Sequence, residues 1–519
     1  MKTPSLLAKL QSNGLIIPLL IALAQLTVHM IFHSQYDYFR DELYYVACSD
    51  HLAFGYVDQP PLSLLILKIS RLILGDSLHA IRFLPALAGA TVVFLTALMA
   101  RKLGAGSFAQ NFAALAAVAA HVLIGHGRYF SMNPFDVLFW AAAGYVIVII
   151  LTHDRPKLWI LFGVIAGLGL QNKYSMGFLC IGITLGLLLS SQRKQLATKW
   201  FWLGVLVAAL IFLPHVLWQI SNGLPSLEFM RNASQNKNVP LGVLDFFLGQ
   251  VRDMNVLNTP IWLLGIYFFF TQREGRYRAL GWMFPIIFTI MVLNNAKVYY
   301  LSAIYPIYLA GGAVAFERFI RARNWSWIKP VYSTLLLVVA VAIAPFALPV
   351  LPVEQFIAYQ KSLGLAPKAE ERSVLAELPQ SYADQFGWRE MIDTVATVYA
   401  QLTPAEKAEC VIYVRNYGEA AAIDFFGGKY GLPKALCAHN SYWYWGPGER
   451  TGNIAIIFGD SRDLQENYDD LRRGYESVEF ITTTNAKYAM PYENGRMIFL
   501  CKGMRTTFQA IWEEERLFI

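Results

Sequence analysis

The chain has 519 residues, of which 56% are hydrophobic and only 15% are charged. Soluble domains carry about a quarter charged residues, so this composition excludes an ordinary soluble protein and indicates a polytopic membrane protein. The net charge of +7 is spread along the chain, which argues against a nucleic-acid partner. The five cysteines show neither a CxxC pair nor metal-ligand spacing, and no metal site or other cofactor is predicted.

Apolar segments alternate with short polar connections through the first 350 residues. A helix that crosses a bilayer needs roughly 17 to 25 residues, and about eleven segments approach that length. The first has no A-x-A-type cleavage site, so we expect a retained helix rather than a cleaved signal peptide. The predicted spans lie at residues 14–33, 80–100, 108–126, 134–152, 157–172, 174–191, 200–219, 259–271, 279–294, 298–316 and 328–350.

The distribution of lysine and arginine predicts the orientation of these spans. Cytoplasmic connections of membrane proteins are enriched in both residues. With a cytoplasmic N-terminus, the connections on that side are short and basic, whereas those on the other side are long and mixed in charge. The longer loops are therefore predicted to be extracytoplasmic.

Two of these outside loops, residues 34–79 and 220–258, exceed connector length. The first contains PLSLLILKISRLILG, whose apolar residues recur at helical spacing and predict a helix lying in the membrane interface. The second contains LGVLDFFLGQV, which predicts another surface helix, preceded by a polar segment that we interpret as a lid.

Beyond residue 350 the composition changes to that of a soluble domain. Helix-like runs alternate with strand-like runs at 410–416, 435–440, 454–460 and 497–503, which predicts an α/β domain with a partly parallel sheet. The predicted organisation is thus a transmembrane domain at 1–350 and an extracytoplasmic α/β domain at 351–519. Cys437 and Cys501 fall on predicted strands and could either form a disulfide or remain free thiols.

Residues 36–62, YDYFRDELYYVACSDHLAFGYVDQPPL, directly follow the first span and combine five acidic residues with seven aromatic ones. One interpretation is a solvated loop with an interfacial aromatic belt. The other is an active site placed just outside the membrane.

Further ionisable residues lie at the predicted outer ends of spans, where charged side chains are costly and usually functional. Each also has a structural interpretation: Lys173 and Lys297 as snorkelling anchors, Arg128 and Asp136 as a capping ion pair, and His215 as a packing histidine. Their convergence on one membrane face favours the functional interpretation.

Such a set suits group transfer from an anionic, lipid-linked donor. A carboxylate takes the proton from an acceptor hydroxyl, while lysines stabilise the departing phosphate. The main rival is a lipid or polysaccharide transporter or flippase, but the chain shows no internal repeat and its charges gather at one face. A non-catalytic envelope assembly protein is a third possibility.

Several motifs resemble the bacterial branch of glycosyltransferase family 39, whose relatives include protein O-mannosyltransferases and lipid A aminoarabinose transferases. They occur in the order RDELYY, HLAFGYVDQPPL, SMNPFD, GLGLQNKYS and KVYYLSAIYP, and FGWREMIDTVATVY and NYGEAAAIDFFGGKYGLP extend the resemblance into the C-terminal region. The resemblance implies a GT-C fold in the bacterial inner (plasma) membrane, with an extracytoplasmic active site and a polyprenyl-phosphate sugar as donor.

The resemblance also implies roles for individual residues. Asp41 corresponds to the catalytic base and Glu42 to its neighbour in the motif. Gln59 stands where aminoarabinose transferases have a lysine, so the sugar and the acceptor (a lipid, glycan or protein hydroxyl) stay open. The expected donor-binding residues are Lys173, Lys297, Tyr299, Tyr300 and Arg128, and the expected substrate-binding residues are Tyr45, Asp58, Gln59, Asn133 and Asp136.

Overall fold

The computed structural model describes residues 14–237, 239–272, 275–367, 371–459 and 463–519. The chain divides into two compact units. Unit 1 contains the residues up to Gln35 together with Leu74–Trp218 and Pro240–Pro352, and unit 2 contains Tyr36–Ile73, Gln219–Val239 and Val353–Ile519. Unit 2 thus combines the C-terminal region with parts of both long loops, which the sequence analysis had assigned to the first domain.

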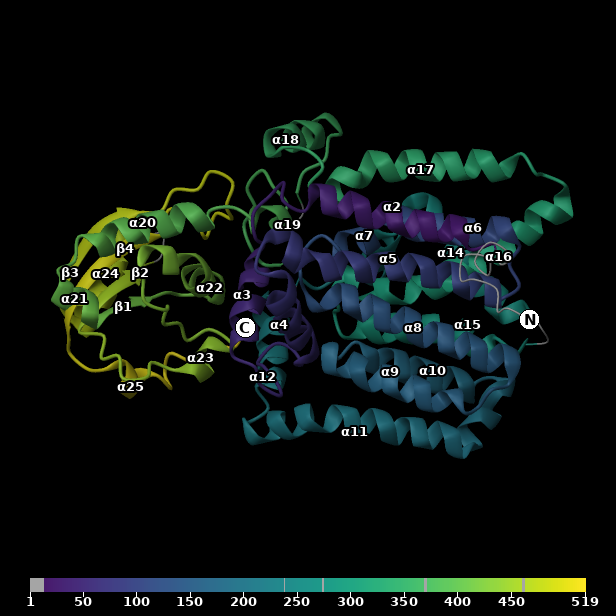
Figure 1. Cartoon of the computed structure of the whole chain (residues 1–519), viewed down its shortest axis with the longest axis horizontal. Helices are drawn as coiled ribbons and strands as arrows, with labels where there is room; N and C mark the ends of the chain where they lie inside the picture. The colour runs from purple at the N-terminus through teal and green to yellow at the C-terminus, as the bar shows by residue number, and fades with distance from the viewer. Residues whose placement is uncertain (1–13, 238, 273–274, 368–370, 460–462) are drawn as a thin grey trace. The chain divides into compact units, whose positions relative to one another are not determined.

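Unit 1 is built from helices (Figure 1). Their apolar faces form one continuous core in which many side chains are fully buried. The elements are α2 (Ile16–Phe32), α5 (Leu78–Lys102), α6 (Ser107–Ala119), α7 (His121–His126), α8 (Met132–His153), α9 (Leu158–Asn172), α10 (Met176–Leu188), η1 (Ser191–Ala197), α11 (Lys199–Ser221), α13 (Val243–Asp253), η3 (Val256–Asn258), α14 (Thr259–Thr271), α15 (Arg278–Leu293), η5 (Val298–Ile304), α16 (Tyr305–Arg323) and α17 (Ile328–Ala347).

Five helical segments are long and apolar enough to cross a membrane: α5, α8, α11, α17 and the continuous stretch of η5 and α16. Two bent pairs bring the number to as many as seven, namely α10 with η1, bent by 116°, and α13 with η3 and α14, bent by 101°. Four shorter apolar helices, α2, α6, α9 and α15, occupy the other predicted spans. The predicted apolar segments are therefore helical. Among the described residues, five to seven helical segments are long and apolar enough to cross a membrane.

Small residues allow neighbouring helices of unit 1 to approach closely. A Cβ atom added at Gly265 on α14 would lie 2.0 Å from the carbonyl oxygen of Tyr308 on α16, and one added at Gly312 would lie 1.9 Å from that of Ile261. Only glycine fits at either position, as is typical of packed membrane helices. The α14–α16 pair is consequently held at backbone contact distance.

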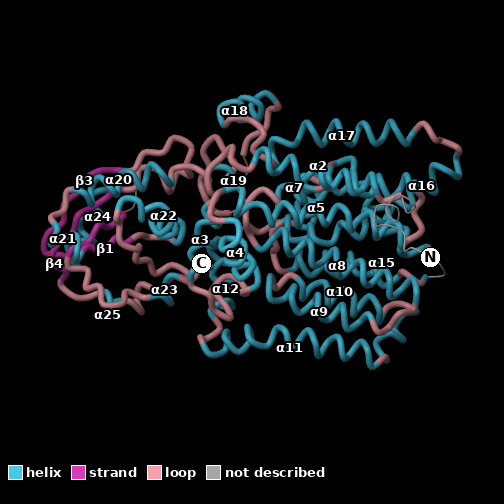
Figure 2. The backbone as a smooth tube through the Cα atoms, in the orientation of Figure 1, coloured by secondary structure: helices cyan, strands magenta, loops and turns pink. Residues whose placement is uncertain are grey.

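Unit 2 contains a four-stranded sheet with the order β1-β2-β4-β3, drawn in magenta in Figure 2. β1 (Cys410–Tyr413) runs parallel to β2 (Ile454–Phe458), and β4 (Met497–Met504) pairs antiparallel with both β2 and β3 (Tyr475–Thr483). The partly parallel sheet predicted for the C-terminal region is confirmed.

The helices of unit 2 come from both long loops and from the C-terminal region. The amphipathic segment of the first loop is α4, whose Leu64 and Leu67 are buried while Leu72 and Ile73 are exposed. The elements are α3 (Arg40–Asp50), α4 (Leu62–Leu74), α12 (Pro225–Asn232), η2 (Ala233–Lys237), α18 (Val353–Ser362), α19 (Gln380–Ala383), α20 (Trp388–Ala400), α21 (Pro404–Glu409), α22 (Tyr417–Phe426), η6 (Gly427–Tyr430), α23 (Tyr442–Trp445), α24 (Leu464–Gly474) and α25 (Phe508–Ile511).

Two details of the predicted sheet are wrong. Residues 435–440 form only isolated bridges, Leu436 with Tyr413 and His439 with Leu517, because the segment turns at Asn440, where φ is +50°. β3 was not predicted, since most of its side chains are exposed or half-buried on a sheet edge and give no apolar alternation. The five cysteines, including Cys437 and Cys501, are free thiols.

Candidate active site

The first turn of α3 presents an aspartate followed by a glutamate. Glu42 is fully buried, and its Oε2 accepts a hydrogen bond of 2.9 Å from the backbone N–H of Phe39. A side chain that satisfies an N–H group at a helix start fixes where the helix begins. Glu42 therefore anchors the first turn of α3 and with it the position of Asp41.

Asp41 is the partly exposed member of this pair, with 37% of its side chain accessible. Its Oδ1 accepts a hydrogen bond of 3.0 Å from the Tyr417 hydroxyl on α22 and lies 3.5 Å from Nε of Arg40. Within the described residues, no hydrogen bond to its Oδ2 is seen. One carboxylate oxygen is thus held, and the other is available to a substrate.

Arg40 connects Asp41 to a buried acid. Its Nη2 lies 3.7 Å from Oδ2 of Asp384, and its Nη1 donates to the Tyr492 hydroxyl. Its guanidinium carbon lies 5.4 Å from the centre of the Tyr417 ring. Burial raises the pKa of Asp384 to about 6, and the adjacent guanidinium opposes that rise.

Asp58 lies in the same unit and forms a second network. Its Oδ1 accepts a hydrogen bond of 3.0 Å from the Tyr44 hydroxyl, which in turn accepts one of 3.1 Å from the backbone N–H of Ser441. Burial raises the pKa of Asp58 to about 6, with the charge of Asp41 contributing in the same direction. Asp58 therefore changes charge near neutral pH close to Asp41.

Gln59 and Tyr45 are also buried in unit 2. Gln59 is fully inaccessible, and neither atom of its side-chain amide has a hydrogen-bond partner among the described residues. Burying an unpaired amide is costly.

The second group of predicted residues lies in unit 1 around Lys173. Its ammonium donates a hydrogen bond of 2.7 Å to Oδ1 of Asn133 and lies 3.5 Å from Oδ2 of Asp136. The rings of Tyr300 and Tyr299 are 4.6 and 5.7 Å away, within reach of a cation–π interaction. The Lys173 side chain is only 10% exposed, so this residue is not a snorkelling anchor with its charge in water.

Asp136 is enclosed by its partners. Besides Lys173, it accepts a hydrogen bond of 2.5 Å from the Ser175 hydroxyl. Its ion pair at 3.5 Å is with Lys173. Arg128 donates to the carbonyl oxygen of Ala347 at 3.2 Å.

The two other candidates of unit 1 occupy different surroundings. Lys297 is half-buried and immediately precedes η5, which carries Tyr299 and Tyr300. His215 is buried and shares a hydrogen bond of 2.7 Å with the Tyr174 hydroxyl, as expected of a packing histidine.

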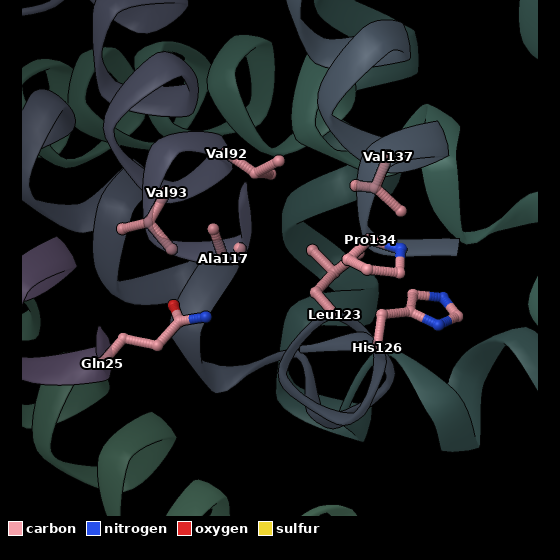
Figure 3. Close-up of a pocket in the computed structure, with 9 residues that line it drawn as sticks. Gln25, Val92, Val93, Ala117, Leu123, His126, Pro134 and Val137 are labelled. Carbon is pink, nitrogen blue, oxygen red and sulfur yellow. The ribbon is translucent and has the colours of Figure 1, made fainter. Parts of the chain in front are cut away.

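Unit 1 also contains a small cavity (Figure 3). Its lining includes Gln25, Val93, Leu123, His126 and Pro134. Its volume of about 10 Å³ admits roughly one water molecule. A sugar or phosphate cannot fit, so this cavity is not the substrate site.

The predicted residues thus fall into two clusters, one in each unit. The Asp41 cluster also contains residues that the sequence does not predict there, namely Arg40, Tyr417, Asp384 and Tyr492. Tyr417 is the second residue of the segment NYGEAAAIDFFGGKYGLP, so this motif gave a signal for it, but nothing in the local sequence indicated Asp41 as its partner.

Comparison with known proteins agrees with this architecture. A family model described as dolichyl-phosphate-mannose-protein mannosyltransferase matches residues 58–218. The crystal structure of ArnT from Cupriavidus metallidurans in the apo state superposes with a TM-score of 0.61 at 14% identity, covering 93% of this chain and 97% of that one. The chain therefore shares the fold of this structure. The predicted GT-C fold with a C-terminal α/β region is confirmed.

Two other relatives are more similar in sequence but match over shorter stretches. The undecaprenyl phosphate-alpha-4-amino-4-deoxy-L-arabinose arabinosyl transferase 1 of Pseudomonas fluorescens is 27% identical over 217 residues, and the lipid A galacturonosyltransferase RgtD of Rhizobium johnstonii is 24% identical over 289 residues. These matches cover 41% and 54% of this chain but only 36% and 60% of the two relatives. The ArnT structure bound to undecaprenyl phosphate superposes with a TM-score of 0.60 at 14% identity, covering 93% of this chain and 97% of that one.

Proposed function

We propose that this protein is a membrane glycosyltransferase that moves a monosaccharide from a polyprenyl-phosphate donor to a hydroxyl group of an extracytoplasmic acceptor. The observation that carries the proposal is the carboxylate of Asp41, which is partly exposed, held through one oxygen and open at the other. The names of the matched relatives support the reaction class, and the ArnT structure bound to undecaprenyl phosphate supports the class of donor.

Asp41 acts as the general base in this proposal. Its open oxygen takes the proton of the acceptor hydroxyl while the acceptor oxygen bonds to the anomeric carbon. The bond between that carbon and the phosphate oxygen breaks, and polyprenyl phosphate leaves with the electron pair. Phosphate is a good leaving group, so a second carboxyl group is not required as a general acid to protonate it.

The cluster around Lys173 is the proposed donor-phosphate site, together with Lys297, Tyr299, Tyr300 and Arg128. An ammonium group has three N–H donors, and Asn133 and Asp136 account for two of those on Lys173. The remaining donor can bind a phosphate oxygen and stabilise the charge that develops as the anomeric bond breaks.

Tyr45, Asp58 and Gln59 are the proposed substrate contacts beside Asp41. The neutral amide of Gln59 offers two N–H donors and a carbonyl acceptor, which suits a sugar or acceptor hydroxyl better than a second phosphate. The acceptor is a lipid, glycan or protein hydroxyl, and the site faces the extracytoplasmic side of the inner membrane.

The experiment that tests the function compares cells carrying the gene, lacking it, or carrying Asp41→Asn. Mass spectrometry of envelope glycolipids, glycans and proteins is expected to reveal one glycosylated product that is absent from both the deletion strain and the Asp41→Asn strain. Identical envelopes in all three strains would contradict the proposal.

A further inference from the structure

Three segments of the C-terminal region contact the first turn of α3. The Tyr417 hydroxyl donates a hydrogen bond to Oδ1 of Asp41. The Tyr492 hydroxyl accepts one from the Arg40 guanidinium, and Asp384 lies 3.7 Å from the same guanidinium. The backbone carbonyl of Asp384 also accepts a hydrogen bond of 3.0 Å from the backbone N–H of Arg40. The residue preceding the proposed base is therefore tied to the C-terminal region through both its backbone and its side chain.

The position of Tyr417 is itself defined by its surroundings. Its ring lies 4.5 Å from that of Tyr44 on α3, measured between centroids. At Gly418, an added Cβ atom would lie 2.5 Å from Cγ of Arg40, so the start of α22 touches the arginine stem and only glycine fits. The Asn416 side chain caps α22 by accepting from the backbone N–H groups of Gly418 and Glu419 at 2.9 and 3.0 Å. The Tyr417 hydroxyl is thus presented to Asp41 by a rigid helix start.

We infer that Tyr417 is a positioning residue for Asp41, and that the C-terminal region is a built part of the catalytic centre rather than an accessory domain. This inference rests on the proposed function. Tyr417 keeps its own proton and fixes Oδ1, which aims Oδ2 at the acceptor hydroxyl. The Arg40 guanidinium, which pairs with Asp384, lies 3.5 Å from Oδ1 and restrains the same carboxylate. Misplacing a reacting group by about 1 Å costs on the order of 100-fold in rate.

The test compares Tyr417→Phe with Tyr442→Phe in the full-length protein, reconstituted in lipid nanodiscs. Tyr442 is a matched control because it is also buried in unit 2 and donates to a carboxylate, Oδ2 of Asp424, at 3.0 Å. Transfer from an undecaprenyl-phosphate sugar to the acceptor identified by mass spectrometry gives kcat and KM. Tyr417→Phe is expected to lower kcat by about 10- to 100-fold with both KM values unchanged, and Tyr442→Phe to leave kcat within twofold.

Two further results separate positioning from a purely structural role. Arg40→Lys is expected to recover part of the kcat that Arg40→Ala loses, because a cation is restored beside Asp41. A cryo-EM structure of Tyr417→Phe is expected to show Asp41 in more than one rotamer. If the wild type is active and Tyr417→Phe has a normal kcat, the inference is wrong and the proposed function stands. The same conclusion follows if both phenylalanine variants lose kcat equally. An inactive wild type overturns the proposed function and the inference with it.

Discussion

The Asp41 cluster of unit 2 and the Asp136 cluster of unit 1 each place a carboxylate beside a cation and a hydroxyl group, but they differ in access to solvent. The side chain of Asp41 is 37% exposed and contacts its cation, Arg40, at 3.5 Å through the oxygen that also binds Tyr417. The side chain of Asp136 is 4% exposed, and its two oxygens are taken by Lys173 and Ser175. An acid with an open oxygen can accept a proton from a substrate, whereas an enclosed acid holds its partner in place.

The largest effect is expected when the charge of Asp41 is removed while its shape is kept. In Asp41→Asn the amide oxygen still accepts from Tyr417, so the fold is expected to persist. Loss of a general base lowers the rate by about 10²- to 10⁴-fold, and transfer from an undecaprenyl-phosphate sugar should fall by that factor. Near-normal turnover would reject Asp41 as the base.

Asp50 provides the matched control for that variant. It lies at the other end of α3 and pairs with Lys68 and Arg71 at 2.6 and 2.9 Å. Asp50→Asn removes the same charge from the same helix, and turnover is expected to stay within twofold of the wild type.

The enclosed cluster predicts an effect on stability. Asp136→Ala leaves the Lys173 ammonium buried without its counter-ion, and breaking a buried ion pair in this way costs about 3–5 kcal/mol. Thermal unfolding of the protein in detergent should therefore begin at a markedly lower temperature. Replacing Lys173 by Met in the same protein should recover part of the loss, and a melting temperature equal to that of the wild type in Asp136→Ala would exclude a structural role for the pair.

The proposed phosphate contact at Lys297 predicts a smaller effect on binding. A hydrogen bond to a charged group contributes about 1.5–3 kcal/mol, so Lys297→Ala is expected to raise the donor KM at least tenfold with a smaller change in kcat. Lys329→Ala is the control, because Lys329 lies over the Phe108 ring and belongs to neither cluster. If kcat and donor KM are both unchanged in Lys297→Ala, its phosphate role is rejected.

The contrast between the clusters also separates what the sequence could reveal from what it could not. Apolar length located most helices of unit 1, and the acidic pair DE within RDELYY after the first span singled out Asp41. Tyr417 lies 376 residues from Asp41 along the chain, and Asp384 meets Arg40 over a similar separation. Local patterns carry no information about such pairs, because tertiary packing alone brings them together. The degree of burial is equally hidden in the sequence: Lys173 and Lys297 look alike there, yet Lys173 is buried and Lys297 is half-buried.

The smallest effect is expected at Asp58. It tests whether burying a carboxylate near Asp41 lowers the free energy of unfolding at neutral pH. Its pKa is raised from 3.8 to about 6 by burial, so the folded protein binds this proton more tightly than the unfolded chain does. The stability that the protonated group contributes is complete below about pH 4 and is lost as the pH rises through about 6. Allowing for the partial exposure of Asp58, the loss amounts to about 1–2 kcal/mol.

Asp58→Asn keeps an acceptor for Tyr44 but removes the titration, so its melting temperature should fall less between pH 5 and pH 7 than that of the wild type. Part of the wild-type dependence should persist, because the pKa of Asp384 is raised to about 6 by the same cause. Equal pH dependence in the two proteins would mean that Asp58 is already ionised throughout this range. Water would then reach Asp58 more readily than its burial indicates, and the low-dielectric surroundings of Asp384 would not extend to Asp58.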